Sequence, residues 1–186
     1  ININEGDTLL EAKLTNGNNQ IILANRSGYA IRFNEDKVRT MGRTAAGVRG
    51  MSLSEKDDLV VGMIIVDPQD QETAILVISE NGFGKRSAVA EYRVTNRGGK
   101  GVRTLMITSK TGALIAIKAV REEDDLMITN KSGVMIRTHV SDIRIMGRAT
   151  QGVKVMRLDD GDAIADVGVV RKGEDDEADT EDIDFA

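Results

Sequence analysis

Three blocks of equal length that align without a gap constrain the fold of this 186-residue chain more than any other feature. Successive blocks start 54 residues apart (26 to 80) and then 51 residues apart (80 to 131). A period near 50 residues is typical of arrays in which each unit buries its apolar face against its neighbours. The blocks are RSGYAIRFNEDKVRTMGRTAAGVR (Arg26 to Arg49), ENGFGKRSAVAEYRVTNRGGKGVR (Glu80 to Arg103) and KSGVMIRTHVSDIRIMGRATQGVK (Lys131 to Lys154).

Short apolar runs on both sides of a recurring glycine predict β-hairpins. Gly28, Gly82 and Gly133 each stand between two such runs, where a tight turn favours a residue that tolerates positive φ. No long window has a helical period. Four short strands per repeat predict an all-β, propeller-like blade. The expected strands are 21–24, 74–78 and 126–129 before the turn, 29–33, 83–86 and 134–137 after it, and 60–66, 114–120 and 163–170 at the end of each unit.

The first residues match the end of a repeat, because residues 9–14 align with residues 60–65 at an offset of 51. We therefore expect an incomplete ring of about three and a half blades, whose first blade begins upstream of Ile1. The predicted units are 1–20, the end of a truncated blade; 21–73, 74–124 and 125–170, three blade repeats; and 171–186, an acidic tail.

The net charge of −5 is unevenly distributed. From Arg171 to the end there are two basic and eight acidic residues, whereas the preceding 170 residues hold 23 basic and 22 acidic residues. The body is thus nearly neutral, and the tail, with few apolar groups to bury, is predicted to be disordered. Two hypotheses for the tail stay open: competition with a polyanion for the basic loops, or a merely solubilising end.

Cations gather beside glycines in the second half of each block, and such a repeated array suits a long polyanion such as duplex DNA. With two tyrosines, three phenylalanines and no tryptophan, the chain lacks the stacking platforms of single-strand binders. We therefore predict contact with the backbone of bent duplex. Strand alternation is expected to turn Arg32, Arg86 and Arg137 away from the core, extending the same surface. The predicted DNA-binding residues are Arg32, Lys37, Arg39, Arg43, Arg49, Lys85, Arg86, Arg93, Arg97, Lys100, Arg103, Arg137, Arg144, Arg148 and Lys154.

Other chemistry has little support. The chain has no cysteine and one histidine, His139, so thiolate and multi-histidine metal sites are excluded. Acidic turns at 57–58, 122–125 and 159–162 are interpreted as solvated loops. We predict no catalytic residue, no metal and no cofactor. No apolar run approaches the roughly 20 residues that cross a bilayer, and a cytoplasmic location without membrane association is expected.

The segment Tyr92-Arg93-Val94-Thr95-Asn96-Arg97-Gly98-Gly99-Lys100-Gly101, together with VRTMGRTAAGVRGM and IRIMGRATQGVKVM, resembles the C-terminal domain of the DNA gyrase A subunit, part of a type IIA topoisomerase. The resemblance covers essentially the whole chain. It implies a β-pinwheel, a propeller-like ring of four-stranded blades that exchange strands. It also implies DNA wrapping around the outer rim, in support of ATP-dependent negative supercoiling by an A2B2 enzyme of gyrase A and B subunits. Cleavage chemistry, ATP and Mg would belong to other parts of that enzyme.

The family's hallmark box reads glutamine-arginine-arginine-glycine-glycine-basic-glycine. Residues 96–101 lack its leading glutamine and first arginine, so the resemblance places the true box upstream of Ile1. Two alternatives stay open at this point: the corresponding domain of topoisomerase IV, and a propeller-type scaffold whose basic loops recognise an acidic protein. A salt titration of duplex binding separates a scaffold from a DNA-binding domain.

Overall fold

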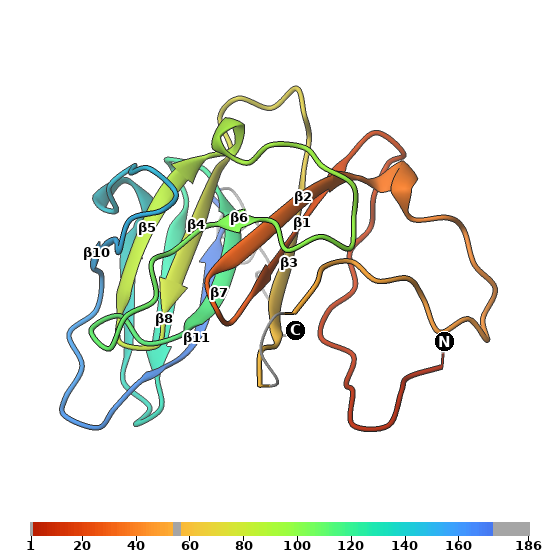
Figure 1. Ribbon diagram of the computed structural model, residues 1–186. Helices are drawn as coiled ribbons and strands as arrows, with labels where there is room; N and C mark the ends of the chain where they lie inside the picture. Colours follow the sequence, from red (N-terminus) through yellow and green to blue (C-terminus); the bar gives the residue numbers. More distant parts are fainter. Residues whose placement is uncertain (1, 54–56, 173–186) are drawn as a thin grey trace, which may run out of the picture.

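Three β-sheets stand face to face like consecutive blades (Figure 1). The computed structural model describes residues 2–53 and 57–172. The predicted acidic tail therefore lies outside the described residues, apart from its first two. The all-β prediction is confirmed, because three short 3-10 helices are the only helical elements in the described part of the chain.

The first sheet has the order β3-β1-β2-β6 and the second the order β10-β5-β4-β7. Each takes three strands from one repeat and a two-residue fourth strand from the next repeat, which is the strand exchange that the resemblance implied. The third sheet, β11-β8-β9, has three strands. The strands are β1 (Gln20–Asn25), β2 (Tyr29–Asn34), β3 (Val60–Val66), β4 (Ala74–Ser79), β5 (Phe83–Ala88), β6 (Val102–Arg103), β7 (Leu114–Val120), β8 (Asp125–Asn130), β9 (Met135–His139), β10 (Val153–Lys154) and β11 (Ile164–Val170).

All neighbouring strands pair antiparallel, and the hairpins β1–β2, β4–β5 and β8–β9 close on the expected glycine turns. Gly28, Gly82 and Gly133 adopt positive φ there, as the sequence predicted. A Cβ at Gly82 would also lie 2.4 Å from the Met156 carbonyl oxygen. The close approach of the third repeat therefore requires a residue without a side chain at this position. A 3-10 helix follows the second strand of each repeat: η1 (Glu35–Lys37), η2 (Val89–Glu91) and η3 (Val140–Asp142).

The hydrophobic core lies between the sheets. One cluster joins Ile22 and Ile64 of the first repeat to Ile75 and Leu105 of the second. Another joins residues of the second repeat to residues of the third, such as Leu126. Every residue of β4 is buried, because its alternate side chains enter the two clusters. A sheet that is covered on both faces explains the continuous apolar run 74–78.

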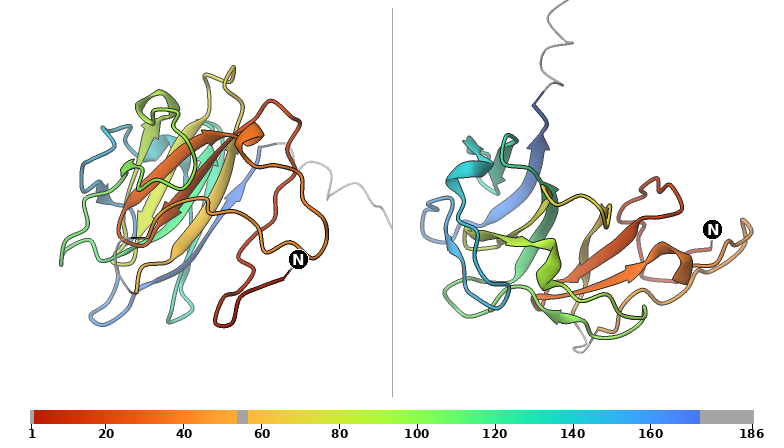
Figure 2. Two further views of the ribbon diagram at one scale, coloured as in Figure 1. Left: turned by 45° about the vertical axis from the view of Figure 1, so that its right-hand side comes forward. Right: turned by 90° about the horizontal axis from the view of Figure 1, so that it is seen from above.

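The last strands of the repeats lie on one side of the stack, where β7 is in contact with both β3 and β11. Residues 2–19 contain no strand, and Leu9, Leu10 and Leu14 are exposed there. The loops that follow the 3-10 helices occupy the other side. Seen from above, residues 143–153, 92–101 and 38–50 follow one another along the front of the molecule (Figure 2).

Candidate nucleic-acid interface

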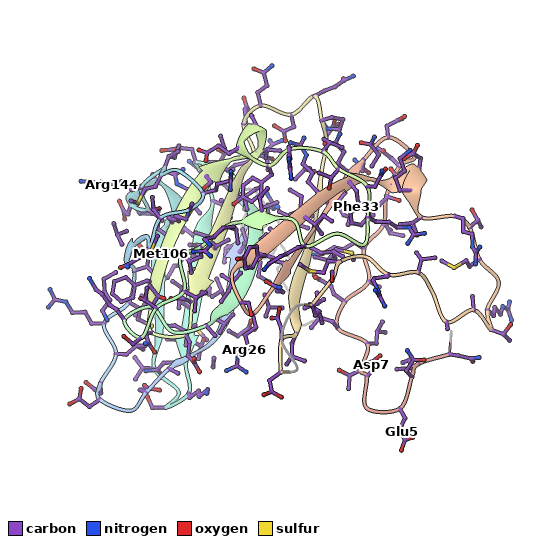
Figure 3. The ribbon with its side chains drawn as sticks, in the orientation of Figure 1. Glu5, Asp7, Arg26, Phe33, Met106 and Arg144 are labelled. Atoms are coloured by element: carbon purple, nitrogen blue, oxygen red, sulfur yellow. The ribbon has the colours of Figure 1, made fainter. Side chains whose placement is uncertain are left out.

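Three basic segments form one continuous edge, and we call them rim loop 1 (residues 38–53), rim loop 2 (92–106) and rim loop 3 (143–157). Loops 1 and 2 are joined by backbone hydrogen bonds from Gly98 N to Gly50 O (2.6 Å) and from Ser52 N to Gly99 O (2.9 Å). Loops 2 and 3 are joined by a bond from Met106 N to Thr150 O (3.0 Å). Arg144 and Met106 lie on this side of the molecule, whereas Arg26 lies at its lower end (Figure 3).

Equivalent arginines strengthen both junctions. Arg97 of loop 2 donates from Nε to the Lys37 carbonyl (2.8 Å) and from Nη1 to the Arg49 carbonyl (3.0 Å). Arg148 of loop 3 donates from Nη1 to the carbonyl of Arg103, the residue equivalent to Arg49 (3.2 Å). Both arginines were predicted to bind DNA. In the structure they join consecutive loops and remain half-buried at the surface.

Most of the predicted cations on this edge are exposed. Within residues 2–53 and 57–172, no ion pair joins these exposed loop cations to a carboxylate. Their charges are therefore available to an external anion. They are Arg39, Arg43, Arg49, Arg93, Lys100, Arg103, Arg144 and Lys154.

The expectation that Arg32 and Arg86 face outwards is wrong, because they are 9% and 4% exposed. Alternating side chains point into solvent only when one face of the sheet is uncovered. These sheets are covered on both faces. Arg32 Nη1 donates to the carbonyls of Val89 (2.8 Å) and Tyr92 (3.1 Å), and Arg86 Nε donates to that of Ile143 (2.6 Å). Each buried guanidinium thus fastens the 3-10 helix of the next repeat.

Lys85 was also predicted to contact DNA, and it is fully buried. Its Nζ donates to the carbonyls of Gly147 (2.6 Å) and Arg148 and to Ser87 Oγ (3.3 Å). Desolvation lowers the pKa of Lys85 to about 8, opposed by the charge of Glu91. Lys85 therefore holds the backbone of rim loop 3 from the interior of the protein, and its amine does not reach the surface.

Two further predicted cations are exposed but have carboxylate neighbours. Lys37 lies 3.4 Å from Asp36. Arg137 Nε donates to Asp125 Oδ2 (2.7 Å), and the other oxygen of this carboxylate lies 2.6 Å from His139 Nδ1. These hydrogen bonds hold the pKa of Asp125 below its usual value, with Arg137 the largest cause. Arg137 thus differs from its equivalents in the first two repeats, which bind carbonyls of a following repeat.

The prediction of solvated acidic turns holds for most of their carboxylates, since Asp57, Glu122, Glu123, Asp159 and Asp160 are exposed, but it is wrong for two. Asp58 and Asp124 are 5% and 2% exposed. Asp58 accepts hydrogen bonds from Asn25 Nδ2 (2.6 Å) and Ser27 N (3.0 Å), and Asp124 accepts one from Arg121 N (2.8 Å). Their carboxylates close turns. Among the described residues no group of three or more His, Cys, Asp or Glu side chains could hold a metal ion.

Sequence reasoning missed three residues at this edge: the aromatic side chains of Tyr29 and Phe83, and Lys110. The cationic groups of Lys100 and Arg103 lie over the Tyr29 ring, and those of Lys110 and Lys154 lie over the Phe83 ring. The signal was present, because both aromatic residues directly follow the turn glycines of their repeats. Tyr92, in contrast, is buried and its hydroxyl lies 2.6 Å from Thr104 Oγ1.

Comparison with known proteins gives a consistent result. The A subunit of DNA gyrase from Staphylococcus epidermidis is 46% identical over 175 residues, which are 94% of this chain and 19% of that protein. The same protein from Staphylococcus aureus MRSA252 is 41% identical over 97% of this chain and 20% of its own length. The chain thus spans about a fifth of the length of these relatives. No described helix is long and apolar enough to cross a membrane.

Solved structures agree. A DNA gyrase A C-terminal domain superposes with a TM-score of 0.83 at 28% identity, covering 92% of this chain and 57% of that one. The C-terminal domain of DNA topoisomerase IV shares the fold, with a TM-score of 0.82 at 24% identity over 91% and 52% of the two chains. The model of the DNA gyrase C-terminal domain, a β-propeller, matches residues 19–67, 73–121 and 124–171. Repeat by repeat, then, this chain belongs to the family of DNA gyrase C-terminal domains.

Proposed function

We propose that this chain binds duplex DNA through its three rim loops, by contacts to the phosphate backbone. The supporting observation is the continuity of the edge: hydrogen bonds join loop 1 to loop 2 and loop 2 to loop 3, and the exposed cations on them have no carboxylate partner among the described residues. A stiff polyanion such as duplex DNA can contact the cations of the three loops one after another. Residues 2–53 and 57–172 contain no recognition helix that could read base edges, so sequence preference would come from DNA deformability.

Within a gyrase, this edge would wrap DNA and so support ATP-dependent negative supercoiling by the whole enzyme. This part of the proposal is based on the relatives, which are the A subunits of DNA gyrases. The remainder of the A subunit, together with the B subunit in an A2B2 assembly, would supply strand cleavage and the sites for ATP and Mg. The chain itself would contribute no cofactor site and would act in the cytoplasm.

A salt titration of binding to linear duplex DNA tests the proposal. Four simultaneous phosphate contacts predict that log K falls with log salt concentration with a slope of about −3.6. Replacing Arg49, Arg93 and Arg144 by glutamine should flatten the slope by about 1 for each phosphate that is no longer neutralised. As a matched control, Arg121→Gln removes one charge that lies beside Asp70 and Glu72, and it should leave the slope unchanged.

The scaffold alternative predicts a different outcome. If the basic edge recognised an acidic protein, duplex binding would be weak and would show no steep salt dependence. A shallow slope for the unaltered chain would therefore refute the DNA proposal. A steep slope that the rim variants do not change would place the contacts elsewhere on the molecule.

A further inference from the structure

Strand exchange brings aromatic rings and cations together across the repeat boundary. Tyr29 opens β2 and is the cross-strand partner of Arg103 in β6. Phe83 opens β5 and is the cross-strand partner of Lys154 in β10. In both pairs the ring comes from one repeat and the cation from the next. Directly opposed residues of antiparallel strands have neighbouring side chains, so the exchange itself sets the pairing.

A second cation approaches each ring, from the same rim loop at Tyr29 and from a separate turn at Phe83. Lys100 Nζ lies 4.4 Å from the centre of the Tyr29 ring, and Arg103 Cζ lies 5.5 Å from it. Lys154 Nζ lies 4.7 Å from the centre of the Phe83 ring, and Lys110 Nζ lies 5.2 Å from it. Lys110 belongs to a turn of the second repeat. Asn81 Nδ2 fixes this turn by donating to the carbonyls of Ser109 and Lys110, both at 3.2 Å.

Two cations on one ring repel each other, and the ring attracts each of them only weakly. A single anion beside the ring would be attracted by both. No ion pair within the described residues supplies such an anion to Lys100, Arg103, Lys110 or Lys154. The geometry therefore leaves a concentrated positive charge that suits a singly charged oxyanion.

The hydroxyl of Tyr29 supports this interpretation. It accepts a hydrogen bond from Arg103 Nη2 at 3.1 Å. That bond is the largest cause that lowers the pKa of Tyr29, and the charges of Arg103 and Lys100 lower it further. The ring therefore lies in a field that favours negative charge.

We propose that Tyr29 and Phe83 are positioning residues of two phosphate-binding stations, Tyr29–Lys100–Arg103 and Phe83–Lys110–Lys154, each of which holds one phosphodiester group of bound duplex. The inference rests on the proposed DNA binding and adds the aromatic residues and Lys110 to it. The third repeat has Val134 at the ring position and therefore has no such station. The two stations lie on consecutive blades, as contacts along one DNA backbone require.

The test measures duplex affinity and its salt slope for the whole chain. Tyr29→Leu removes the ring but no charge, and we expect about a fivefold loss of affinity, from the strength of two exposed cation–π contacts. Tyr29→Trp should restore affinity because it restores the ring. Val134→Leu, at the same position of the third repeat, is the matched control and should bind as the unaltered chain does. Thermal unfolding of each variant checks that the fold is retained.

A double-mutant cycle separates positioning from a general effect on stability. In a chain that already carries Lys100→Gln and Arg103→Gln, Tyr29→Leu should cause no further loss. Because Phe83 is buried and its replacement can unfold the hairpin, the second station is tested by Lys110→Gln. This exposed change should flatten the salt slope by about 1.

The outcomes distinguish this inference from the proposal on which it rests. If the unaltered chain shows no salt-dependent duplex binding, both are wrong. If it does, but Tyr29→Leu and Lys110→Gln bind with unchanged affinity and slope, the stations alone are refuted. Losses that simply add in the cycle would also overturn the positioning role.

Discussion

Replacing Arg86 by methionine tests how the blades are held together. The Arg86 side chain is 5% exposed. Its Nε donates to the Ile143 carbonyl (2.6 Å) and its Nη2 donates more weakly to the Ser141 carbonyl (3.4 Å), and both acceptors belong to the third repeat. Its Nη1 donates to Glu122 (2.6 Å). Methionine keeps much of the packing volume of arginine but removes these donors.

The cost follows from the exposure of each partner. A hydrogen bond from a charged donor contributes about 1.5–3 kcal/mol, and removing the short bond to Ile143 also leaves a carbonyl without its partner. The bond to Ser141 is long and adds little. Glu122 is two-thirds exposed, so water screens the ion pair and it adds little to stability. We therefore expect the free energy of unfolding to fall by about 2–3 kcal/mol.

Urea unfolding followed by circular dichroism measures this change, and hydrogen exchange locates it. The amide of Met146 donates to the Arg86 carbonyl (2.8 Å), so its protection should fall once η3 loses its anchor. Glu122→Gln is the control, because it weakens only the exposed ion pair and should reduce stability much less than Arg86→Met does. Equal stability losses in the two variants would refute the assignment of Arg86 as the inter-blade anchor.

Three further predictions concern stability. Desolvation lowers the pKa of Lys85 from 10.5 to about 8, so the unfolded chain binds more protons there between these pH values. Urea unfolding should therefore show the unaltered chain gaining stability relative to Lys85→Met as the pH rises from 8 towards 10. The hydrogen bond from Thr73 is the largest cause that lowers the pKa of Asp70 to about 2. The stability advantage over Asp70→Asn should be present above about pH 4 and lost as the pH falls through about 2. Asn25→Ala should cost about 2 kcal/mol in the same assay, because Asn25 bonds both Asp58 and Tyr29 N. Ser79→Ala, at the equivalent position, should change stability by less than about 1 kcal/mol, since Ser79 Oγ has no hydrogen-bond partner in the described part of the chain.

Each of these predictions has a result that contradicts it. A difference between the unaltered chain and Lys85→Met that stays constant with pH would mean that this amine keeps its ordinary pKa. For Asp70→Asn, an advantage that disappears well above pH 4 would mean that the carboxyl pKa is not lowered. Equal losses for Asn25→Ala and Ser79→Ala would mean that the Asn25 hydrogen bonds add nothing to the turn.

The sequence predicted the strands well because the local signals were sufficient. The apolar run at 74–78 and the glycine turns lie within single repeats, and the structure has β4 and the three hairpins there. The error on Arg32 and Arg86 has a different origin. The alternation of side chains along a strand predicts on which face of the sheet each side chain lies. It does not predict whether that face is covered, and here residues of a repeat more than 50 positions away cover it.

The basic edge was predictable as a set of residues and unpredictable in its internal contacts. Arg39, Arg93 and Arg144 are exposed as expected. Arg97 instead donates to the carbonyls of Lys37 in η1 and Arg49 in rim loop 1, contacts between residues 60 and 48 positions apart that no local pattern encodes. The stacking of Lys100 on Tyr29 depends on strand exchange in the same way.

Chemical acetylation of lysines with and without duplex DNA tests the central claim most directly. Lys37, Lys100 and Lys154 lie on or beside the basic edge, and bound DNA should protect all three. Lys131 is exposed beside Arg26 and Glu80, on the side formed by the last strands of the repeats, and should react equally in both conditions. Protection confined to the edge lysines is the predicted result. Equal protection of Lys131, or full reactivity of Lys100 and Lys154 in the complex, would contradict DNA binding along the rim loops.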